Sequence, residues 1–360
     1  MKQLNTEPLS TGEVPSTLFA AANSGRGFVS FYDRIFGRDQ ITRRYIVKGG
    51  PGTGKSSFMR QIARYAEEQG MAVEYYRCSS DPDSLDGIVL DGRIAMMDGT
   101  APHTVEPELP GARDEIVNLG EFWDGERLAG HYNEIVALSA LKSNCYRKAY
   151  RFLSAAMEVE LVNRELIRPS VRHEKMRGAV GRLLRAVPDE DEFRLLPGLV
   201  DSIGMKGSVR LDTYEKQAKR LYVVEDHYGT GGLFLNLVVE EAQRKGCAVR
   251  VSYQPLTPEL PDAVYFCQSG VCFVIGEYGE REPDGRVNMK RFLDVGALSE
   301  VKVEYRLNRH LIDGLIGAAT EALTDAGRHH FALEQIYVSC MDFDSQRKFV
   351  RSFCQKVRKS

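Results

Sequence analysis

The chain has 360 residues, of which 43% are hydrophobic and 27% charged; this composition is typical of a globular protein with a substantial core and excludes a disordered chain. The formal net charge of -2 excludes a global basic field, so charge gives no reason to expect a nucleic-acid partner. No apolar run is long enough to span a membrane and residues 1–15 contain no apolar signal core, so we expect a cytoplasmic protein without a membrane segment.

A strand, a glycine-rich loop and a helix are predicted in succession near the start of the chain. The strand is the run Arg43 to Lys48, and the helix extends from Ser57 to Gln69 and ends at Gly70. The loop between them fits the pattern G-x-x-x-x-G-K-[ST] in full, which is the signature of a phosphate-binding loop, or P-loop. The expected nucleotide-binding residues are Gly49, Gly50, Pro51, Gly52, Thr53, Gly54, Lys55, Ser56 and Ser57.

The residue types of this loop suit a triphosphate. Glycines let the backbone wrap so that successive N–H groups converge on phosphate oxygens, and the following helix adds its positive end. We expect Lys55 to place its charge on the β- and γ-phosphates and to act in catalysis, and the Ser56 hydroxyl to be a ligand of Mg²⁺. A glycine-rich turn that merely starts a helix has no need of Lys-Ser after its last glycine. The loop therefore predicts binding of a purine nucleoside triphosphate, as Mg-ATP.

A β-hairpin is predicted over residues 88–97, with Asp91-Gly92 as its two-residue turn. A P-loop site usually holds Mg²⁺ through an aspartate at the end of a neighbouring apolar strand. Asp91 follows the first strand of the hairpin and Asp98 follows the second, so both have the required form. We favour Asp98 as the metal-linked, catalytic carboxylate because Asp91 fits the turn better. The alternative for Asp98 is a plain carboxylate at the end of a strand.

The segment 99–115 is predicted to be a long irregular loop that starts at the mouth of this site. Several of its polar residues are candidates for base, water-orienting or charge-stabilising roles, with ordinary solvated side chains as the alternative. They are His103, which we select as catalytic, and Glu106, Arg113 and Glu115. Three earlier acids could meet a substrate, but we interpret them as helix caps around Pro82. These acids are Asp81, Asp83 and Asp86.

The second half of the chain repeats this order of elements. Arg220 to Glu225 corresponds to Arg43–Lys48, and Gly229 to Gly232 corresponds to Gly52–Lys55, without a gap. A helix, a strand and a hairpin follow in both halves. We therefore predict an internal duplication with its boundary near Pro188. The alternative is two unrelated α/β segments that share a common order of strand, loop and helix.

The expected fold is α/β, with tandem P-loop NTPase domains that are each a mostly parallel sheet flanked by helices. Residues 1–187 form the active P-loop domain in this prediction, and residues 188–360 form a degenerate repeat. The seven cysteines include no Cys-x-x-Cys pair, so neither a disulfide framework nor a zinc site is expected.

The second loop lacks the groups that triphosphate chemistry requires. Gly232 stands at the lysine position, Leu233 at the hydroxyl position, and Gly276 at the position that we assign to Asp98. Asp226 brings negative charge to a place that binds phosphate in the first half. We predict that this copy has kept the fold and lost Mg²⁺-triphosphate binding, while its backbone N–H groups can still form an anion nest.

Several longer strings resemble a poorly characterised bacterial family of tandem P-loop proteins that are labelled as ATPases or nucleotide kinases. The residues that carry the resemblance are Gly49–Ser56, Ser79–Gly87, Asp98–His103, Val117–Asp124 and Met341-Asp342-Phe343. The resemblance covers most of the chain and implies a P-loop fold and ATP binding, without a secure substrate. Members of that family often keep Gly-Lys-Ser or Gly-Lys-Thr in the second half, and this chain departs from them there.

From these observations we expect an ATP-binding protein with one functional site. The leading hypothesis is a Mg-dependent ATPase or ATP-driven switch. The alternatives are a small-molecule or nucleotide kinase and a nucleotide-binding scaffold that does not hydrolyse ATP. The expected partner besides ATP is a small molecule or protein of unknown identity, and no nucleic acid is expected.

Overall fold

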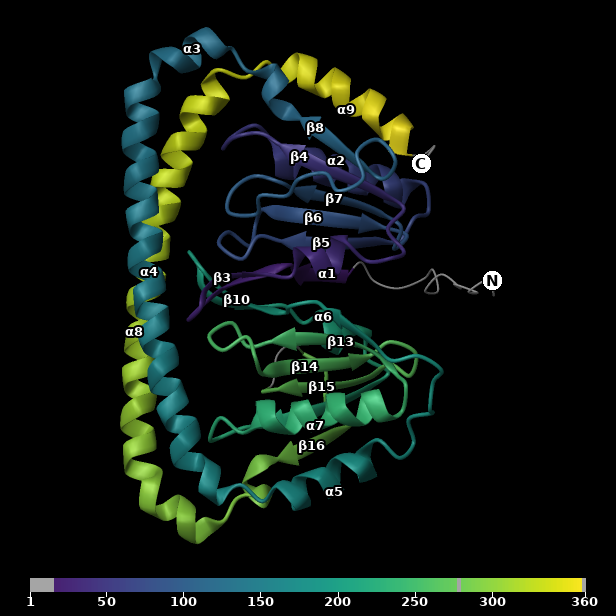
Figure 1. Ribbon diagram of the computed structural model, residues 1–360, viewed down its shortest axis with the longest axis vertical. Coiled ribbons are helices and arrows are strands. Elements are labelled where there is room, and N and C mark those ends of the chain that lie inside the picture. The colour runs from purple at the N-terminus through teal and green to yellow at the C-terminus, as the bar shows by residue number, and fades with distance from the viewer. Residues whose placement is uncertain (1–15, 277–279, 358–360) are drawn as a thin grey trace. The chain divides into compact units, whose positions relative to one another are not determined.

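The computed structural model describes residues 16–276 and 280–357. It is an α/β structure with two six-stranded, mostly parallel sheets flanked by helices, as the sequence predicts (Figure 1). The chain forms two compact units. The described residues of unit 1 are 16–20, 30–145 and 325–357, and those of unit 2 are 21–29, 146–276 and 280–324.

The sheet of unit 1 has the strand order β1-β5-β6-β7-β4-β8 (Figure 1). Its strands are β1 (Ser16–Phe19), β5 (Val73–Arg77), β6 (Leu85–Leu90), β7 (Ile94–Asp98), β4 (Arg43–Lys48) and β8 (Asp114–Asn118). Strand β6 is antiparallel to both neighbours, and the other pairings are parallel. The carboxyl ends of β4 and β7 therefore lie at the same edge of the sheet.

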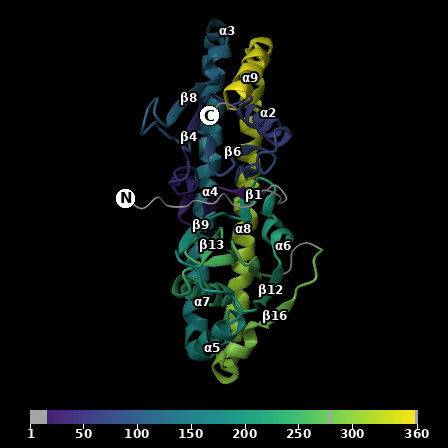
Figure 2. The ribbon, with the colours of Figure 1, turned by 90° about the vertical axis from the view of Figure 1, so that its right-hand side faces the viewer.

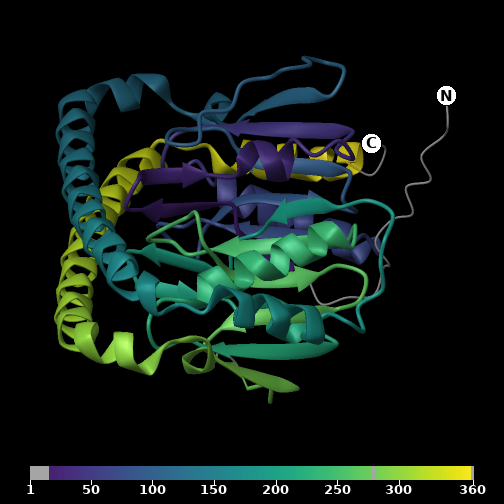
Figure 3. The ribbon, with the colours of Figure 1, turned by 60° about the horizontal axis from the view of Figure 1, so that its bottom comes forward.

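The sheet of unit 2, drawn in green in Figure 3, has the order β9-β13-β14-β15-β12-β16. This order matches that of the first sheet strand by strand. Its strands are β9 (Arg194–Pro197), β13 (Ala248–Tyr253), β14 (Pro261–Phe266), β15 (Val271–Ile275), β12 (Arg220–Glu225) and β16 (Gly285–Asn288). Strand β14 is the antiparallel one, as β6 is in the first sheet. An equal strand order with an equal pattern of strand directions supports the predicted duplication.

Two helices pack on each sheet core. In unit 1 these are α2 (Lys55–Glu68) and α9 (Phe343–Val357) (Figure 2). The ring centroid of Phe353 lies 5.2 Å from that of Phe58 and 4.9 Å from that of Tyr45. In unit 2 they are α7 (Gly231–Arg244) and α5 (His173–Leu183), whose Met176 and Val180 share one apolar core with Phe234.

The remaining elements are short, except for two long helices. The long helices are α4 (Tyr132–Ile167) and α8 (Val295–Ser339). The short helices are α1 (Tyr32–Phe36), α3 (Gly125–Gly130), α6 (Thr213–Gln217), η1 (Leu119–Phe122), η2 (Arg168–Ser170) and η3 (Met289–Phe292). Two hairpins pair β2 (Ala21–Ser24) with β3 (Gly27–Ser30) and β10 (Asp201–Gly204) with β11 (Gly207–Arg210).

The compact units and the predicted division at residues 187 and 188 are different partitions of the chain. The two six-stranded sheets follow the predicted halves, because all strands of the first precede that position and all strands of the second follow it. The helices do not. Helix α5 comes from the first half and belongs to unit 2, whereas α9 comes from the second half and belongs to unit 1. Each sheet therefore has one covering helix from the other half of the sequence.

Candidate nucleotide site

The glycine-rich loop connects the carboxyl end of β4 to the first turn of α2. Gly52 and Gly54 have φ angles of 69° and 77°, a left-handed backbone that favours glycine. A Cβ atom on Gly52 would lie 2.7 Å from the carbonyl oxygen of Glu334, so this position also lacks room for a side chain. The glycines of the pattern thus meet both a conformational and a steric requirement.

Lys55 and Asp98 lie together at this loop. The Lys55 ammonium donates hydrogen bonds to the carbonyls of Gly49 (2.9 Å) and Gly50 (3.0 Å), and its Nζ lies 3.6 Å from Asp98 Oδ2. The pairing of β4 with β7 causes this proximity, because Val47 lies opposite Asp98 in the parallel register. Two residues that are 43 positions apart in the sequence are thereby brought to one edge of the sheet.

Asp98 is a partly buried carboxylate that is oriented by hydrogen bonds. Its Oδ1 accepts hydrogen bonds from the Thr100 backbone N–H (2.8 Å) and hydroxyl (2.5 Å), while Oδ2 faces Lys55. Burial raises the pKa of Asp98, and the charge of Lys55 and the hydrogen bonds from Thr100 act in the opposite direction. A divalent cation at this carboxylate would further offset the cost of burial.

Ser56 is the second residue that the sequence assigns to the metal. Its Oγ accepts a hydrogen bond from the Leu85 N–H (2.9 Å), which leaves a second lone pair on the oxygen. One hydroxyl and one carboxylate form a small ligand set, which suits Mg²⁺ because this ion keeps several of its waters. Among residues 16–276 and 280–357, no group of three or more His, Cys, Asp or Glu side chains could hold a metal.

Asp91 has the turn role that the sequence predicts for it. It lies between β6 and β7 with a φ angle of 48°, and its Oδ1 accepts a hydrogen bond from the Ala72 N–H (2.8 Å). Asp91 is at the amino end of the parallel strands, the opposite edge of the sheet from the loop. Of the two aspartates that the sequence offers, Asp98 is the one beside Lys55.

His103 is buried against Asp86 and Tyr32. Its Nε2 lies 3.3 Å from Asp86 Oδ2, and its ring stacks on that of Tyr32 at 4.5 Å and 6°. Burial, Asp86 and Asp98 together raise the pKa of the Tyr32 hydroxyl, which places this group in the electrostatic environment of Asp98. The imidazole is therefore held from two sides near the site, and this packing fixes the start of the 99–113 loop.

Asp86 is not a helix cap. It lies in an irregularity of the β5–β6 pairing, where Arg77 pairs with Leu85 and Tyr76 pairs with Gly87, so the intervening carboxylate turns into the interior. The only sequence signal for this placement is an acid inside an otherwise apolar strand. Asp81 instead caps its own turn, with its Oδ2 accepting a hydrogen bond from the Ser84 hydroxyl (2.8 Å).

The other loop candidates are engaged in ion pairs. Strand β8 is parallel to β4, so the chain between β7 and β8 must return to the amino edge of the sheet before β8 begins. Arg113 and Glu115 lie at that far edge, where Glu115 pairs with Arg43. Glu106 lies nearer the loop and binds the Lys48 ammonium (2.7 Å). Glu115 also belongs to β8 rather than to the predicted loop.

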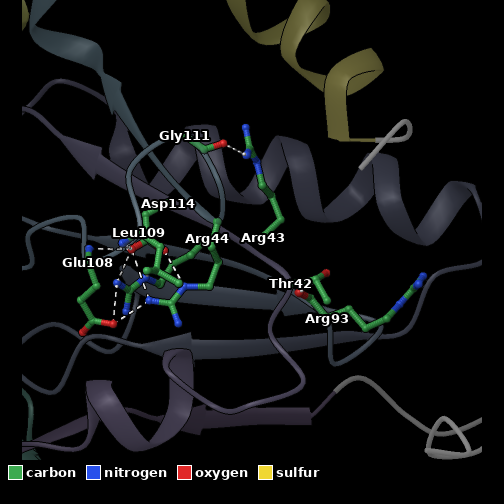
Figure 4. Close-up of polar contacts among 9 residues, drawn as sticks. Thr42, Arg43, Arg44, Arg93, Glu108, Leu109, Gly111 and Asp114 are labelled. Atoms are coloured by element: carbon green, nitrogen blue, oxygen red, sulfur yellow. Dashed lines mark hydrogen bonds and ion pairs between the residues drawn. The ribbon is translucent and has the colours of Figure 1, made fainter. Parts of the chain in front are cut away.

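A buried ion pair fixes β8 on β4 at this far edge (Figure 4). Asp114 accepts hydrogen bonds from Arg44 Nε (2.9 Å) and Nη2 (2.7 Å), and from the N–H groups of Glu108 and Leu109. Burial opposes ionisation of Asp114, but the hydrogen bonds from Arg113, Arg44 and the backbone lower its pKa. These residues stabilise the sheet and do not reach the glycine-rich loop Gly49–Ser56.

Residues from the end of the chain cover the loop, and the sequence gives no sign of them. Gln346 Nε2 donates a hydrogen bond to the Thr53 carbonyl (2.6 Å), and a Cβ on Gly50 would meet Tyr337 at 3.1 Å and Trp123 at 3.3 Å. Trp123 forms a β-bridge with Met341, so two segments that carry the family resemblance contact each other. Local patterns cannot reveal a contact between residues 293 positions apart.

In the second half, the equivalent loop binds its own carboxylate. Asp226 Oδ1 accepts hydrogen bonds from the N–H groups of Tyr228 (3.1 Å) and Thr230 (3.0 Å), and Oδ2 accepts one from Gly231 (2.7 Å). A Cβ on Gly232, at the lysine position, would lie 2.9 Å from the Leu260 Cβ. The backbone N–H groups of this loop thus converge on one point, and the Asp226 carboxylate occupies that point.

The position equivalent to Asp98 requires a correction. We assigned it to Gly276, but Val224 lies opposite Ile275 in the parallel register, as Val47 lies opposite Asp98. The Gly276 N–H also donates to the Val224 carbonyl, as the Gly99 N–H does to that of Val47. Strand pairing shifts the alignment by one residue, so an isoleucine side chain stands where the first half has a carboxylate.

Within the described part of the chain, no helix combines the length and the apolar character that crossing a membrane requires. Comparisons with known proteins give no match, whether with protein-family models, curated proteins or solved structures.

Proposed function

We propose that this protein binds one Mg-ATP at Gly49–Ser56 and acts as a Mg-dependent ATPase or ATP-driven switch. The observation that carries this proposal is the position of Lys55, whose Nζ is held by two loop carbonyls and lies 3.6 Å from Asp98 Oδ2. We also propose that the chain belongs to the family of tandem P-loop ATPases that its sequence resembles.

The chain's own residues account for the binding chemistry in this proposal. Bound ATP would accept hydrogen bonds from the loop N–H groups, and Lys55 would exchange its contacts with the loop carbonyls for contacts with phosphate oxygens. Ser56 and Asp98 would hold Mg²⁺ directly or through water, and this ion would supply positive charge for phosphoryl transfer. Gln346, Tyr337 and Trp123 cover one side of the loop.

A second candidate is phosphoryl transfer to a small molecule. A hollow lined with arginines near the loop Gly49–Ser56 favours this candidate. A third, a nucleotide-binding scaffold without turnover, has no specific structural observation in its favour.

Calorimetry with a non-hydrolysable ATP analogue and Mg²⁺ tests the proposed site. We expect one analogue per chain, because Asp226 occupies the second loop. Two equivalent sites, or no binding, would contradict the proposal. Phosphate release is then measured with ATP alone and with a metabolite panel. Turnover with ATP alone supports the ATPase, turnover only with one metabolite supports the kinase, and tight binding without turnover supports the scaffold.

A further inference from the structure

A hollow of about 520 Å³ lies in unit 1, between helix α2 and strand β5. Three arginines line it, with Arg60 and Arg64 one turn apart on α2 and Arg77 at the carboxyl end of β5. Tyr75, Asp83 and Leu85 also contribute to its wall.

The positive charge in this hollow is not neutralised by ion pairs within the described chain. Arg60 donates to the Asp83 backbone carbonyl and Arg77 donates to that of Pro82 (3.2 Å), and both acceptors are uncharged. Among residues 16–276 and 280–357, none of the three guanidinium groups forms an ion pair with a carboxylate. The lining residues include three arginines and one carboxylate, that of Asp83, so the hollow keeps a net positive charge that favours a bound anion.

The hollow adjoins the nucleotide loop. Leu85 lines the hollow, and its N–H donates to the Ser56 Oγ (2.9 Å). Arg60 follows Ser56 by four residues on α2, so it lies about one helical turn further along the same helix. An anion bound here would be held close to the metal side of the nucleotide loop.

We propose that this hollow binds the phosphate or carboxylate group of a small organic molecule that accepts the γ-phosphoryl group of ATP. Planar guanidinium groups form paired hydrogen bonds with both kinds of oxyanion, which identifies the chemistry of the ligand. A hydroxyl oxygen of the acceptor forms a bond to the γ-phosphorus while the bond to the β–γ bridging oxygen breaks. ADP leaves with that electron pair, and the hydroxyl proton passes to solvent. The acceptor role depends on the proposed function, whereas anion binding by the hollow does not.

The binding experiment uses the full chain with Lys55→Ala, which weakens competing phosphate binding at the loop. The Nε–Hε NMR signals of arginine are followed during titration with inorganic phosphate, glucose 6-phosphate and succinate. We expect the signals of Arg60, Arg64 and Arg77 to shift, and Arg64→Gln to weaken phosphate binding about tenfold or more. The matched control is Arg127→Gln, an exposed arginine on α3, which should leave binding unchanged. Stronger shifts with the two phosphates than with succinate identify a phosphate ligand, and the reverse identifies a carboxylate.

Unshifted signals with all three probes, or equal losses in Arg64→Gln and Arg127→Gln, would overturn the proposal. Intact ATP-analogue binding by the Arg64→Gln chain then shows that the inference has failed while the nucleotide site stands. Anion binding in a protein that does not bind ATP would leave the hollow as a binding site and remove its acceptor role. In a turnover assay, Arg64→Gln should raise the KM of the acceptor and leave the KM of ATP unchanged.

Discussion

Gly49–Ser56 and Asp226–Leu233 join equivalent strands and helices in two sheets of the same order, but they satisfy their backbone N–H groups differently. In the second loop the Asp226 carboxylate accepts three of these hydrogen bonds. In the first loop the equivalent residue is Gly49, and Lys55 and Asp98 stand at its mouth. A backbone nest is a favourable place for an anion, and in the second loop an internal carboxylate occupies it. The comparison shows two loops of similar backbone course, of which one binds its own side chain.

Replacing the lysine of the first loop should have the largest effect. In Lys55→Ala, the charge at the β- and γ-phosphates is lost, and turnover should fall on the order of a hundredfold or more. Phosphate release and analogue binding measure the two consequences, and circular dichroism checks the fold. Arg127→Gln is the control for a lost surface charge. Unchanged turnover in a folded Lys55→Ala protein would contradict the assignment of the first loop as the ATP site.

The two aspartates of the hairpin should separate chemistry from stability. Asp98→Asn should raise the Mg²⁺ concentration needed for turnover on the order of tenfold or more, because a negatively charged ligand becomes neutral. Asp91→Asn should leave the Mg²⁺ dependence unchanged and lower the unfolding midpoint slightly, because Asp91 binds the Ala72 N–H at the far edge. Metal titrations and urea unfolding of both variants are sufficient, and the reverse pattern would show that the metal-linked strand is misassigned.

Removing the Asp226 side chain should leave the N–H groups of the second loop free to bind phosphate. Asp226→Gly removes the acceptor of three N–H groups, so unit 2 should lose about 1–3 kcal/mol of stability and gain phosphate binding at Tyr228–Gly231. Asp226→Asn is an intermediate control, because its amide oxygen can still accept the hydrogen bonds from Tyr228 and Thr230 but its NH2 group cannot accept the one from Gly231. Urea unfolding with and without phosphate measures both effects. If phosphate does not restore stability to Asp226→Gly, the nest is not an anion site.

The smallest effect concerns the pH dependence of Mg²⁺ binding at Asp98. Burial raises the pKa of Asp98 above its ordinary value of about 3.9. The unfolded chain ionises Asp98 first, so this group lowers the stability of the metal-free protein as pH rises from that value to the raised pKa. Mg²⁺ affinity should rise over the same interval, because the carboxylate forms. Calorimetric titration of Mg²⁺ at several pH values should show this slope in the native chain and a smaller one in Asp98→Asn.

The sequence predicts the features of the site that depend on neighbouring residues. The loop motif occupies eight consecutive positions, and the Asp91-Gly92 turn places Asp98 at the end of the strand that pairs with β4. Prediction from the sequence fails for the features of the site that depend on strand register or on packing between distant residues. Ile275 replaces Gly276 at the acid position because of register, and Gln346 reaches Thr53 because α9 folds onto α2. The direction of β8 likewise removes Arg113 and Glu115 from the site, and no local pattern encodes it.

The exchange of α5 and α9 has a consequence for biosynthesis. During translation the nucleotide loop and its whole sheet are synthesised long before α9, so Tyr45 and Phe58 lack the cover of Phe353 until the second half has emerged. A chain that is cut between the halves leaves apolar surface exposed on both fragments, since α5 and α9 are each separated from their sheet. The apolar cover of the first sheet is therefore complete only after residues of the second half have been synthesised.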